Sequence, residues 1–403
     1  TKATTLSPEN SVHHFNLANV FRSLGRFDEA FASYRKAIEN DSKSPAWINL
    51  TALYEDLGLF VEARSTIDDA LRKMPNDARL LVHLGHLNLR DQNFSEGWKQ
   101  KEMYWLSNDK QEPAFETSKP VWRGQSVDQL FVWAEQGIGD QIMYASCIRQ
   151  LASICNSVTV SIDGRLLPLF RRSFPKEVIF IDKTDSYSKV DFDFHVPGMT
   201  ALGLQRQDIF SFEGQNKSYL VANEKQVQNF RARLLDMASK KRIIGLSWFT
   251  NSPRNGNFRS ISIEELLRSL PTDLFLVNLQ YGNFDNDILE ICKKLNRQIY
   301  TFADVNTEDD IDKLAALIVS CDEVITIDNS VAHLAGALGK ETNVLLPYGS
   351  DWRWGNTMDR PNIWYRSVRL NRQHACLDWS ACLRDLRLFD SGNCRQYSSE
   401  GVA

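Results

Sequence analysis

The sequence lacks the features that mark membrane, secreted and nucleic-acid-binding proteins. No apolar run approaches the roughly 18 to 20 residues that a membrane-spanning helix needs, and the N-terminus lacks the charged-then-apolar order of a signal peptide. The net charge is only −4 and both signs are interspersed, so we expect no surface for nucleic acid. These absences favour a cytoplasmic protein without a transmembrane segment.

Cysteine is also scarce, because the 403 residues include only seven, an odd number at scattered positions. Those in apolar stretches are expected to be reduced core residues, namely Cys147, Cys155, Cys292 and Cys321. The spacing of Cys376, Cys382 and Cys394 matches no zinc pattern. Asp191 and Asp193 lie on an alternating strand pattern that suits no cation. We therefore predict no metal site.

The first hundred residues repeat themselves. Leu17, Leu50 and Leu84 recur at intervals of 33 and 34 residues, and the same steps join several phenylalanines and alanines. This period predicts tetratricopeptide repeats from residue 11 to about residue 106, with a concave surface that grips a peptide or serves only as a buttress. The third copy departs from the pattern at Gly97 and Trp98, so we expect it to dock on the next domain.

Apolar strands alternate with helices after the repeats. Strands are predicted at Leu130–Ala134, Val158–Ile162, Val178–Ile181, Phe192–Val196, Ile243–Trp248, Leu274–Gln280, Gln298–Phe302, Val324–Ile327 and Asn343–Leu346. Two such runs predict two Rossmann-like halves. The expected order is a repeat array (1–108), a linker (109–128), an N-terminal Rossmann-like half (129–236), a C-terminal Rossmann-like half (237–375), and a C-terminal helix (Trp379 to Phe389) and tail within 376–403.

One strand runs directly into a helix whose first turn is polar, at Asp328, Asn329 and Ser330. The first N–H groups of a helix have no internal partner and lie at the positive end of its dipole, so this opening can hold a phosphate. Ser330 and His333 are three residues apart and share one side of the turn. An ordinary N-cap with a buried histidine is the alternative.

A second strand-loop-helix junction lies upstream, where Gly137 and Gly139 permit close approach of another molecule. The helix that follows is expected to carry Met143, Cys147, Leu151 and Ile154 at helical spacing. Ligands bind such sheets outside the carboxyl ends of their strands. We therefore expect the two junctions to face each other across a cleft.

Six segments of the chain carry a family resemblance. They are Trp133–Gln141, Phe192–Pro197, Gly245–Trp248 with Asn257–Ile261, Asn278–Gly282, Asp328–Gly336 and Asp351–Trp354. On these segments the C-terminal three quarters resembles the GT-B glycosyltransferases of the heptosyltransferase-like family 9, and specifically bacterial proteins with tetratricopeptide repeats ahead of that region. The resemblance implies an α plus α/β fold, in which helical repeats precede a GT-B fold of two Rossmann-like domains. It also implies a nucleotide-diphosphate sugar as substrate and no further cofactor, with the nucleotide sugar in the C-terminal half (237–375) and the acceptor on the side of the N-terminal half (129–236).

The resemblance assigns Asp140 as the base that removes the acceptor proton, although an acidic residue there can also simply cap its helix. His195, at a strand end, contacts the acceptor or the sugar, or else is structural. The residues expected at the nucleotide sugar are Gly137, Gly139, Ser247, Arg254, Arg259, Gln280, Tyr281, Asp328, Asn329, Ser330, Val331, His333, Trp352 and Arg353. Among them the arginines would pair with phosphates, unless Arg254 and Arg259 belong to a solvated loop. The lysine frequent in this loop of the family is absent.

The leading hypothesis is a metal-independent, inverting glycosyltransferase whose repeats present a protein acceptor. One alternative is an enzyme that acts on a glycan or lipopolysaccharide and uses the repeats structurally. Another is a non-catalytic repeat scaffold with a degenerate GT-B domain. The sequence leaves the base, the sugar and a homodimer open.

Overall fold

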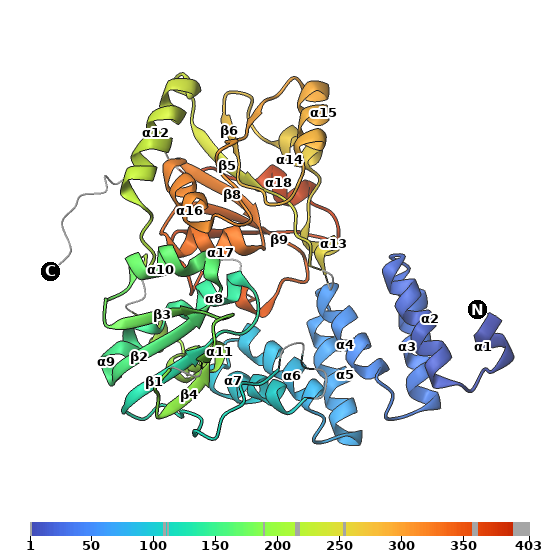
Figure 1. Ribbon diagram of the computed structural model, residues 1–403. Helices are drawn as coiled ribbons and strands as arrows, with labels where there is room; N and C mark the ends of the chain where they lie inside the picture. Colours follow the sequence, from blue (N-terminus) through green and yellow to red (C-terminus); the bar gives the residue numbers. More distant parts are fainter. Residues whose placement is uncertain are drawn as a thin grey trace.

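The computed structural model describes residues 2–107, 110, 113–187, 190–213, 218–252, 255–356 and 362–389. The chain begins with an array of paired helices and continues into two α/β halves (Figure 1). The array consists of α1 (Lys2–Leu6), α2 (Ser11–Ser23), α3 (Phe27–Asn40), α4 (Ala46–Asp56), α5 (Phe60–Lys73), α6 (Ala78–Arg90), α7 (Phe94–Glu102) and the 3₁₀ turn η1 (Met103–Leu106). Small residues such as Ala18, Ala30 and Ala63 are fully buried where these helices pack, as the repeat pattern predicts.

The first half has a four-stranded parallel sheet in the order β3-β2-β1-β4. Its elements are β1 (Val127–Trp133), α8 (Ile138–Ala145), α9 (Ile148–Ile154), β2 (Cys155–Ile162), η2 (Gly164–Leu166), α10 (Leu167–Ser173), β3 (Val178–Asp182), β4 (Phe194–Pro197), α11 (Gly198–Gln205) and η4 (Phe210–Phe212). The single helix expected after Gly139 is wrong. It breaks between α8 and α9, because the N–H groups of Ser146 and Cys147 bond three residues back and tighten the turn.

The second half has a six-stranded parallel sheet in the order β10-β9-β8-β5-β6-β7. Its helices are α12 (Glu224–Ala238), α13 (Gly256–Arg259), α14 (Ile263–Ser269), α15 (Asp285–Leu295), α16 (Ile311–Ser320), α17 (Ser330–Ala337), η5 (Trp352–Trp354) and α18 (Ser380–Asp385). Its strands are β5 (Ile243–Ser247), β6 (Phe275–Asn278), β7 (Ile299–Tyr300), β8 (Glu323–Ile327), β9 (Thr342–Leu346) and β10 (Val368–Arg372).

Two features of this half differ from the sequence expectations. The edge strand β10 was not predicted, because its Val-Arg-Leu-Asn-Arg sequence is half polar. The helix expected over Trp379–Phe389 ends at Asp385, because the following segment extends across the sheet and the N–H of Phe389 donates to Glu323 at 3.1 Å.

Each sheet has one point where the direction of winding reverses. In the first sheet the reversal lies between β1 and β4, and in the second it lies between β5 and β8. Parallel sheets bind ligands at such switch points, outside the carboxyl ends of the strands. Helix α8 starts after β1, and helix α17 starts after β8. Both helix openings predicted as ligand sites therefore lie at switch points.

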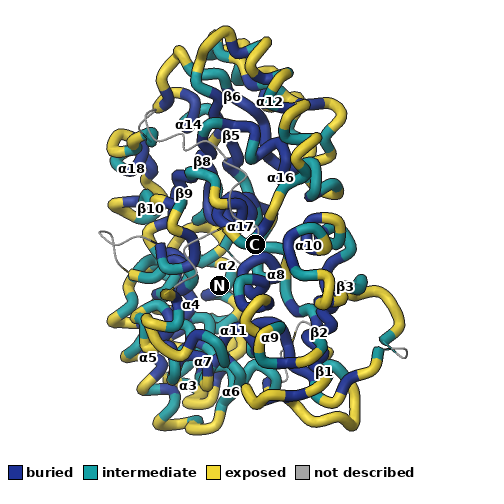
Figure 2. The backbone as a smooth tube through the Cα atoms, turned by 90° about the vertical axis from the view of Figure 1, so that its left-hand side faces the viewer, coloured by how far each residue is buried: buried dark blue, intermediate teal, exposed yellow. Residues whose placement is uncertain are grey.

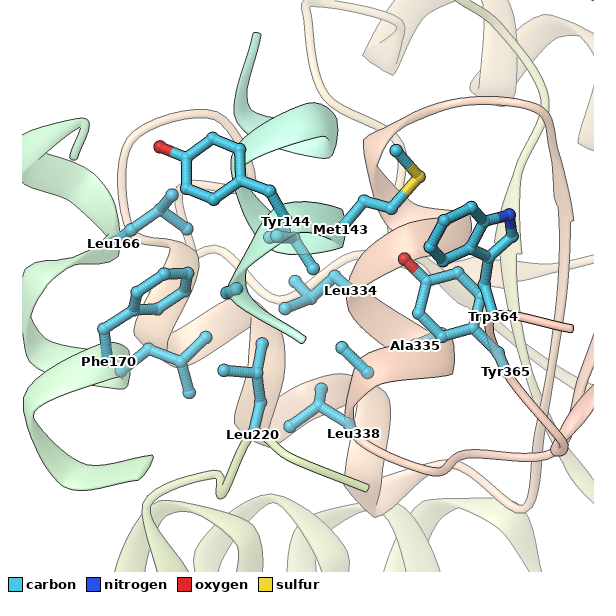
Figure 3. Close-up of a cluster of buried hydrophobic side chains, with 14 of the residues drawn as sticks. Met143, Tyr144, Leu166, Phe170, Leu220, Leu334, Ala335, Leu338, Trp364 and Tyr365 are labelled. Atoms are coloured by element: carbon cyan, nitrogen blue, oxygen red, sulfur yellow. The ribbon is translucent and has the colours of Figure 1, made fainter. Parts of the chain in front are cut away.

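The two halves and the third repeat share one hydrophobic core. Figure 2 shows α17 buried near the middle of the molecule with α8 beside it. Figure 3 shows Met143 and Tyr144 of α8 together with Leu334 and Ala335 of α17 in one cluster of buried side chains. Opposite charges also join the halves, since Arg172 of α10 pairs with Asp312 of α16.

The repeat array docks on both halves. The indole N–H of Trp98 in α7 donates to the carbonyl of Arg206 at 2.7 Å, and its ring lies edge-on to Trp352 with centroids 5.5 Å apart. A Cβ built on Gly203 of α11 would lie 2.9 Å from the Trp98 ring. The unusual Trp98 of the third copy is thus the docking residue, as expected from its departure from the repeat pattern.

The predicted fold class is confirmed: helical repeats precede two Rossmann-like units with parallel sheets in a GT-B arrangement. The six cysteines within the described ranges are free thiols, and Cys394 lies outside those ranges. In the part of the chain that the structure describes, no helix is both long and apolar enough to cross a bilayer.

Candidate active site

The openings of α8 and α17 touch each other. A Cβ built on Gly139 would lie 3.1 Å from Cδ2 of His333 and 3.6 Å from Cα of Ser330. A larger side chain at position 139 would therefore press directly on the first turn of α17. The expected facing of the two junctions is present, but at this point they are in contact.

Arg353 of η5 ties the two openings together. Its guanidinium donates to Asp140 of α8, to Asp351 at 2.7 Å and to Gln136 at 3.4 Å. Burial alone would lower the pKa of Arg353, but the charges of Asp140 and Asp351 outweigh burial and raise it. Burial likewise opposes ionisation of Asp351, yet the Arg353 charge lowers the pKa of that carboxyl. The carboxylate predicted as the base is thus paired with a cation from the other half.

Three predicted ligands form a hydrogen-bonded network at the switch point of the second sheet. The Gln280 amide oxygen accepts from the Ser247 hydroxyl at 3.0 Å and from the N–H groups of Trp248 and Phe249 at 2.9 Å. The Asn329 amide donates to the Ser247 hydroxyl at 2.8 Å, and its oxygen accepts from the N–H of Val331 at 3.0 Å. Asn329 therefore caps α17, and the network holds the ends of β5 and β8 in register.

Arg259 lies against the same opening. Its Nε donates to the Asp328 carbonyl at 2.9 Å and lies 3.2 Å from the Asp328 carboxylate. The Arg259 guanidinium therefore fastens α13 to the end of β8. Arg254 lies outside the described residues.

His333 is buried, with 5% of its surface exposed. Its Nδ1 lies 2.9 Å from the Tyr365 hydroxyl, and its ring stacks on Trp354 with centroids 5.2 Å apart. Burial lowers the pKa of His333 to about 4, so the imidazole is neutral near pH 7. It offers the opening of α17 a hydrogen-bonding group and no charge.

The remaining predicted residues lie at the contact between α8 and α17 or near it. Ser330 is half-buried at the start of α17, and its hydroxyl has no hydrogen-bond partner within the described ranges. Gly137 is the N-cap of α8, and a Cβ there would meet only Asp140 Oδ2 at 3.9 Å. The Tyr281 hydroxyl lies 3.2 Å from that of Thr250 and accepts from the N–H of Asn251. Trp352 is buried, with the Arg353 guanidinium 4.6 Å from its ring centroid.

His195 occupies a different environment. It is 6% exposed in the middle of β4, and its Nδ1 accepts from the indole N–H of Trp133 at 3.1 Å. The Phe115 ring lies 5.4 Å away, and burial lowers the pKa of His195. Within the described ranges no hydrogen bond or ion pair joins His195 to Asp140: His195 is bonded to Trp133, and Asp140 is paired with Arg353.

The site also contains residues that the sequence analysis did not assign. Gln136 has φ 61°, a left-handed conformation that is rare for a residue with a side chain and that turns its amide toward Arg353. Glu135 is 3% exposed and accepts from the N–H of Met199 at 2.7 Å. Lys101 of α7 reaches this region from the repeat array. The first two lie inside a motif that the resemblance used, whereas nothing in the sequence near Lys101 points to the site.

Within the described ranges no three His, Cys, Asp or Glu side chains are grouped so that they could hold a metal ion. Asp193 lies next to β4, where its N–H donates to the Gln129 carbonyl at 3.0 Å. Metal independence stays a prediction.

Comparison with known proteins agrees with the N-terminal architecture. The family model described as "Tetratricopeptide repeat" matches residues 14–44. The paired N-terminal helices are tetratricopeptide repeats. Protein FlbA of Caulobacter vibrioides is 27% identical over 384 residues, which cover 90% of this chain and 58% of FlbA. The chain thus spans less than two thirds of that relative.

Two further similarities involve named transferases. The human protein O-mannosyl-transferase TMTC1 is 30% identical over 100 residues, which cover 24% of this chain and 11% of TMTC1. A solved glycosyl transferase family 9 structure from Veillonella parvula DSM 2008 superposes with a TM-score of 0.45 at 12% identity, over 63% of this chain and 88% of that one.

Proposed function

We propose that the protein transfers a sugar from a nucleotide-diphosphate donor to an acceptor, and that the acceptor is a protein held by the repeats. The observation that carries the proposal is the contact between the openings of α8 and α17, each at the switch point of a parallel sheet. The contact joins a carboxylate of one half to a guanidinium of the other. Such a pair suits a reaction in which one group accepts a proton while another group stabilises a departing anion.

The donor binds on the side of α17. Its diphosphate is a dianion or trianion, which the positive end of the α17 helix dipole and the guanidinium of Arg353 attract. The half-buried Ser330 hydroxyl, without a partner in the described ranges, adds a donor at this turn. The network of Gln280 and Asn329 supports the turn from below and keeps it in place without ligand.

The acceptor binds on the side of α8, where Asp140 is the base. The acceptor oxygen forms a bond to the anomeric carbon as Asp140 takes its proton. The bond between that carbon and the diphosphate oxygen breaks, and its electron pair leaves with the nucleoside diphosphate. Attack opposite the leaving group inverts the anomeric configuration, and the helix opening and Arg353 take the place of a metal ion in stabilising the negative charge.

A protein acceptor is supported by the repeats and by the name of one similar protein, the protein O-mannosyl-transferase TMTC1. Tetratricopeptide arrays commonly grip extended peptides on their concave face. This array is fastened to both halves of the catalytic region through Trp98. A bound segment would therefore be held at a fixed distance from the junction.

The proposal is tested first by ligand-induced stabilisation. Thermal unfolding is measured with UDP, GDP, ADP, CMP and dTDP at millimolar concentration, with and without magnesium. One diphosphate is expected to raise the unfolding midpoint without magnesium, because a ligand that binds only the folded state stabilises it. Ser330→Trp is expected to abolish the shift. Ser380→Trp places the same indole at the exposed start of α18 and should leave the shift intact. If no nucleotide stabilises the wild-type chain, the proposed donor site is wrong.

A further inference from the structure

One lysine of the repeat array is buried in the protein. Lys101 of α7 is 9% exposed, whereas the side chain of Lys99, two residues earlier on the same helix, is 70% exposed. The burial depends on close packing of α6 on α7, since a Cβ built on Gly85 would lie 2.7 Å from the N atom of Lys101. Lysine is rarely buried without a charged or hydrogen-bonding partner.

The surroundings of Lys101 are set by its own helix. Trp98 lies three residues earlier, so the two side chains share one face of α7. On this face Trp98 contacts Trp352, the neighbour of Arg353 in sequence. The facing helix is α11, which packs on α7 and lies beside it in Figures 1 and 2. Glu135 is held to the start of α11 by the N–H of Met199. Lys101 therefore points into the junction of the two halves.

Without the repeat array, three carboxylates at the junction would face a single cation. The groups whose charges act on Lys101 are Glu135, Arg353, Asp140 and Asp351. Burial lowers the pKa of Lys101, and the Glu135 carboxylate opposes that effect. Three carboxylates thus face one cation from the catalytic halves and one from the third repeat.

Two other titratable groups at the site add no positive charge at neutral pH. Burial keeps His333 neutral with a pKa of about 4, and it raises the pKa of Tyr365, so the phenol also stays neutral. His86 of α6 acts on Asp351 and stacks on Trp352 with centroids 6.3 Å apart. Once Arg353 turns to a donor diphosphate, Lys101 remains as a cation that interacts with Asp140.

We propose that Lys101 is a positioning residue for the reaction, and that the third repeat thereby completes the active site instead of only presenting the acceptor. The proposal rests on the transfer reaction proposed above. Lys101 supplies the positive charge that stays beside Asp140 and Glu135 while Arg353 binds the diphosphate. Without it, the Glu135 and Asp140 carboxylates would lack a compensating positive charge while Arg353 is bound to the diphosphate.

The test is the pH dependence of donor turnover in the full chain. Release of nucleoside diphosphate into water is measured for UDP-N-acetylglucosamine, GDP-mannose, ADP-heptose and dTDP-rhamnose, and the donor turned over fastest is carried into pH profiles of kcat/KM. The variants are Lys101→Met, Lys101→Gln and Lys101→Arg, with Lys99→Met as the matched exposed control. Thermal unfolding of each variant shows whether the array remains docked.

Lys101→Met and Lys101→Gln are expected to move the acidic limb of the profile up by about one pH unit, because loss of a nearby cation raises a carboxylate pKa. Lys101→Arg and Lys99→Met should keep the limb at its wild-type position. A uniform fall in rate with an unmoved limb would overturn the proposal, because Lys101 would then serve only in docking. If either neutral variant fails to fold, the other neutral variant supplies the comparison. A wild-type chain inactive with every donor would instead refute the proposed function itself.

Discussion

Acidification should destabilise this protein through one histidine. His333 ordinarily would have a pKa near 6.5, and burial against Tyr365 and Trp354 lowers it to about 4. At a pH between these two values, His333 is therefore protonated in the unfolded chain and neutral in the folded chain. Stability from His333 is fully present above pH 6.5 and is lost as the pH falls toward 4. Linkage gives a loss of about 2 kcal/mol by pH 5 and about 3 kcal/mol by pH 4.

The measurement is urea unfolding followed by tryptophan fluorescence, at pH 7, 6, 5 and 4, for the wild type and for His333→Gln. The variant should be less stable at pH 7 but should lose less of its remaining stability on acidification, by about the same 2 to 3 kcal/mol. Burial also lowers the pKa of His195, but that contribution is common to both proteins and cancels in the comparison. His374→Gln, at a side chain 50% exposed, is the control. Parallel pH dependence in wild type and His333→Gln would refute the burial of a neutral imidazole at the start of α17.

Three further changes test other parts of the site. Arg353→Met leaves two carboxylates without their cation and should lower the free energy of unfolding by about 3 to 5 kcal/mol in urea melts; a loss under about 1 kcal/mol would contradict a buried pair. Gln280→Leu removes the acceptor of three hydrogen bonds and should cost about 1 to 3 kcal/mol for each group left unpaired, with weaker nucleotide binding in calorimetry. Gly349→Val would place a Cβ about 2.1 Å from the Glu55 carbonyl, so limited proteolysis should cut the array faster than in wild type, and unchanged cleavage would disprove docking there.

The local patterns of the sequence predicted the parts of the molecule that depend on neighbouring residues. Periodicity predicts the repeat helices and nine of the strands. The polar residues after Ile327 predict the start of the helix that follows. The edge strand β10 escaped detection, because the polar residues Arg369, Asn371 and Arg372 make this short edge strand resemble a loop. The break after Ala145 escaped as well, because its apolar spacing continues through the turn.

The side-chain partners at the site were less accessible to prediction. Asn329 caps its own helix, and this follows from local rules. The burial of His333 depends on Tyr365, which is 32 residues away, and the pairing of Asp140 depends on Arg353, which is 213 residues away. Lys101 reaches the junction because the array docks there, partly through Trp98. Such partners are set by packing of whole units, which periodicity does not encode.

The position of Trp98 has a mechanical consequence. One indole is hydrogen-bonded to the first half at Arg206 and touches the second half at Trp352, so it contacts both halves at once. Any swing that opens the seam between α8 and α17 must shear one of these contacts or carry the helical array with one half. A polypeptide bound along the array would then move with it. The length and stiffness of that polypeptide would determine how far α8 and α17 separate. Under the proposed function, the binding of the acceptor and the entry of the donor would therefore depend on the same movement.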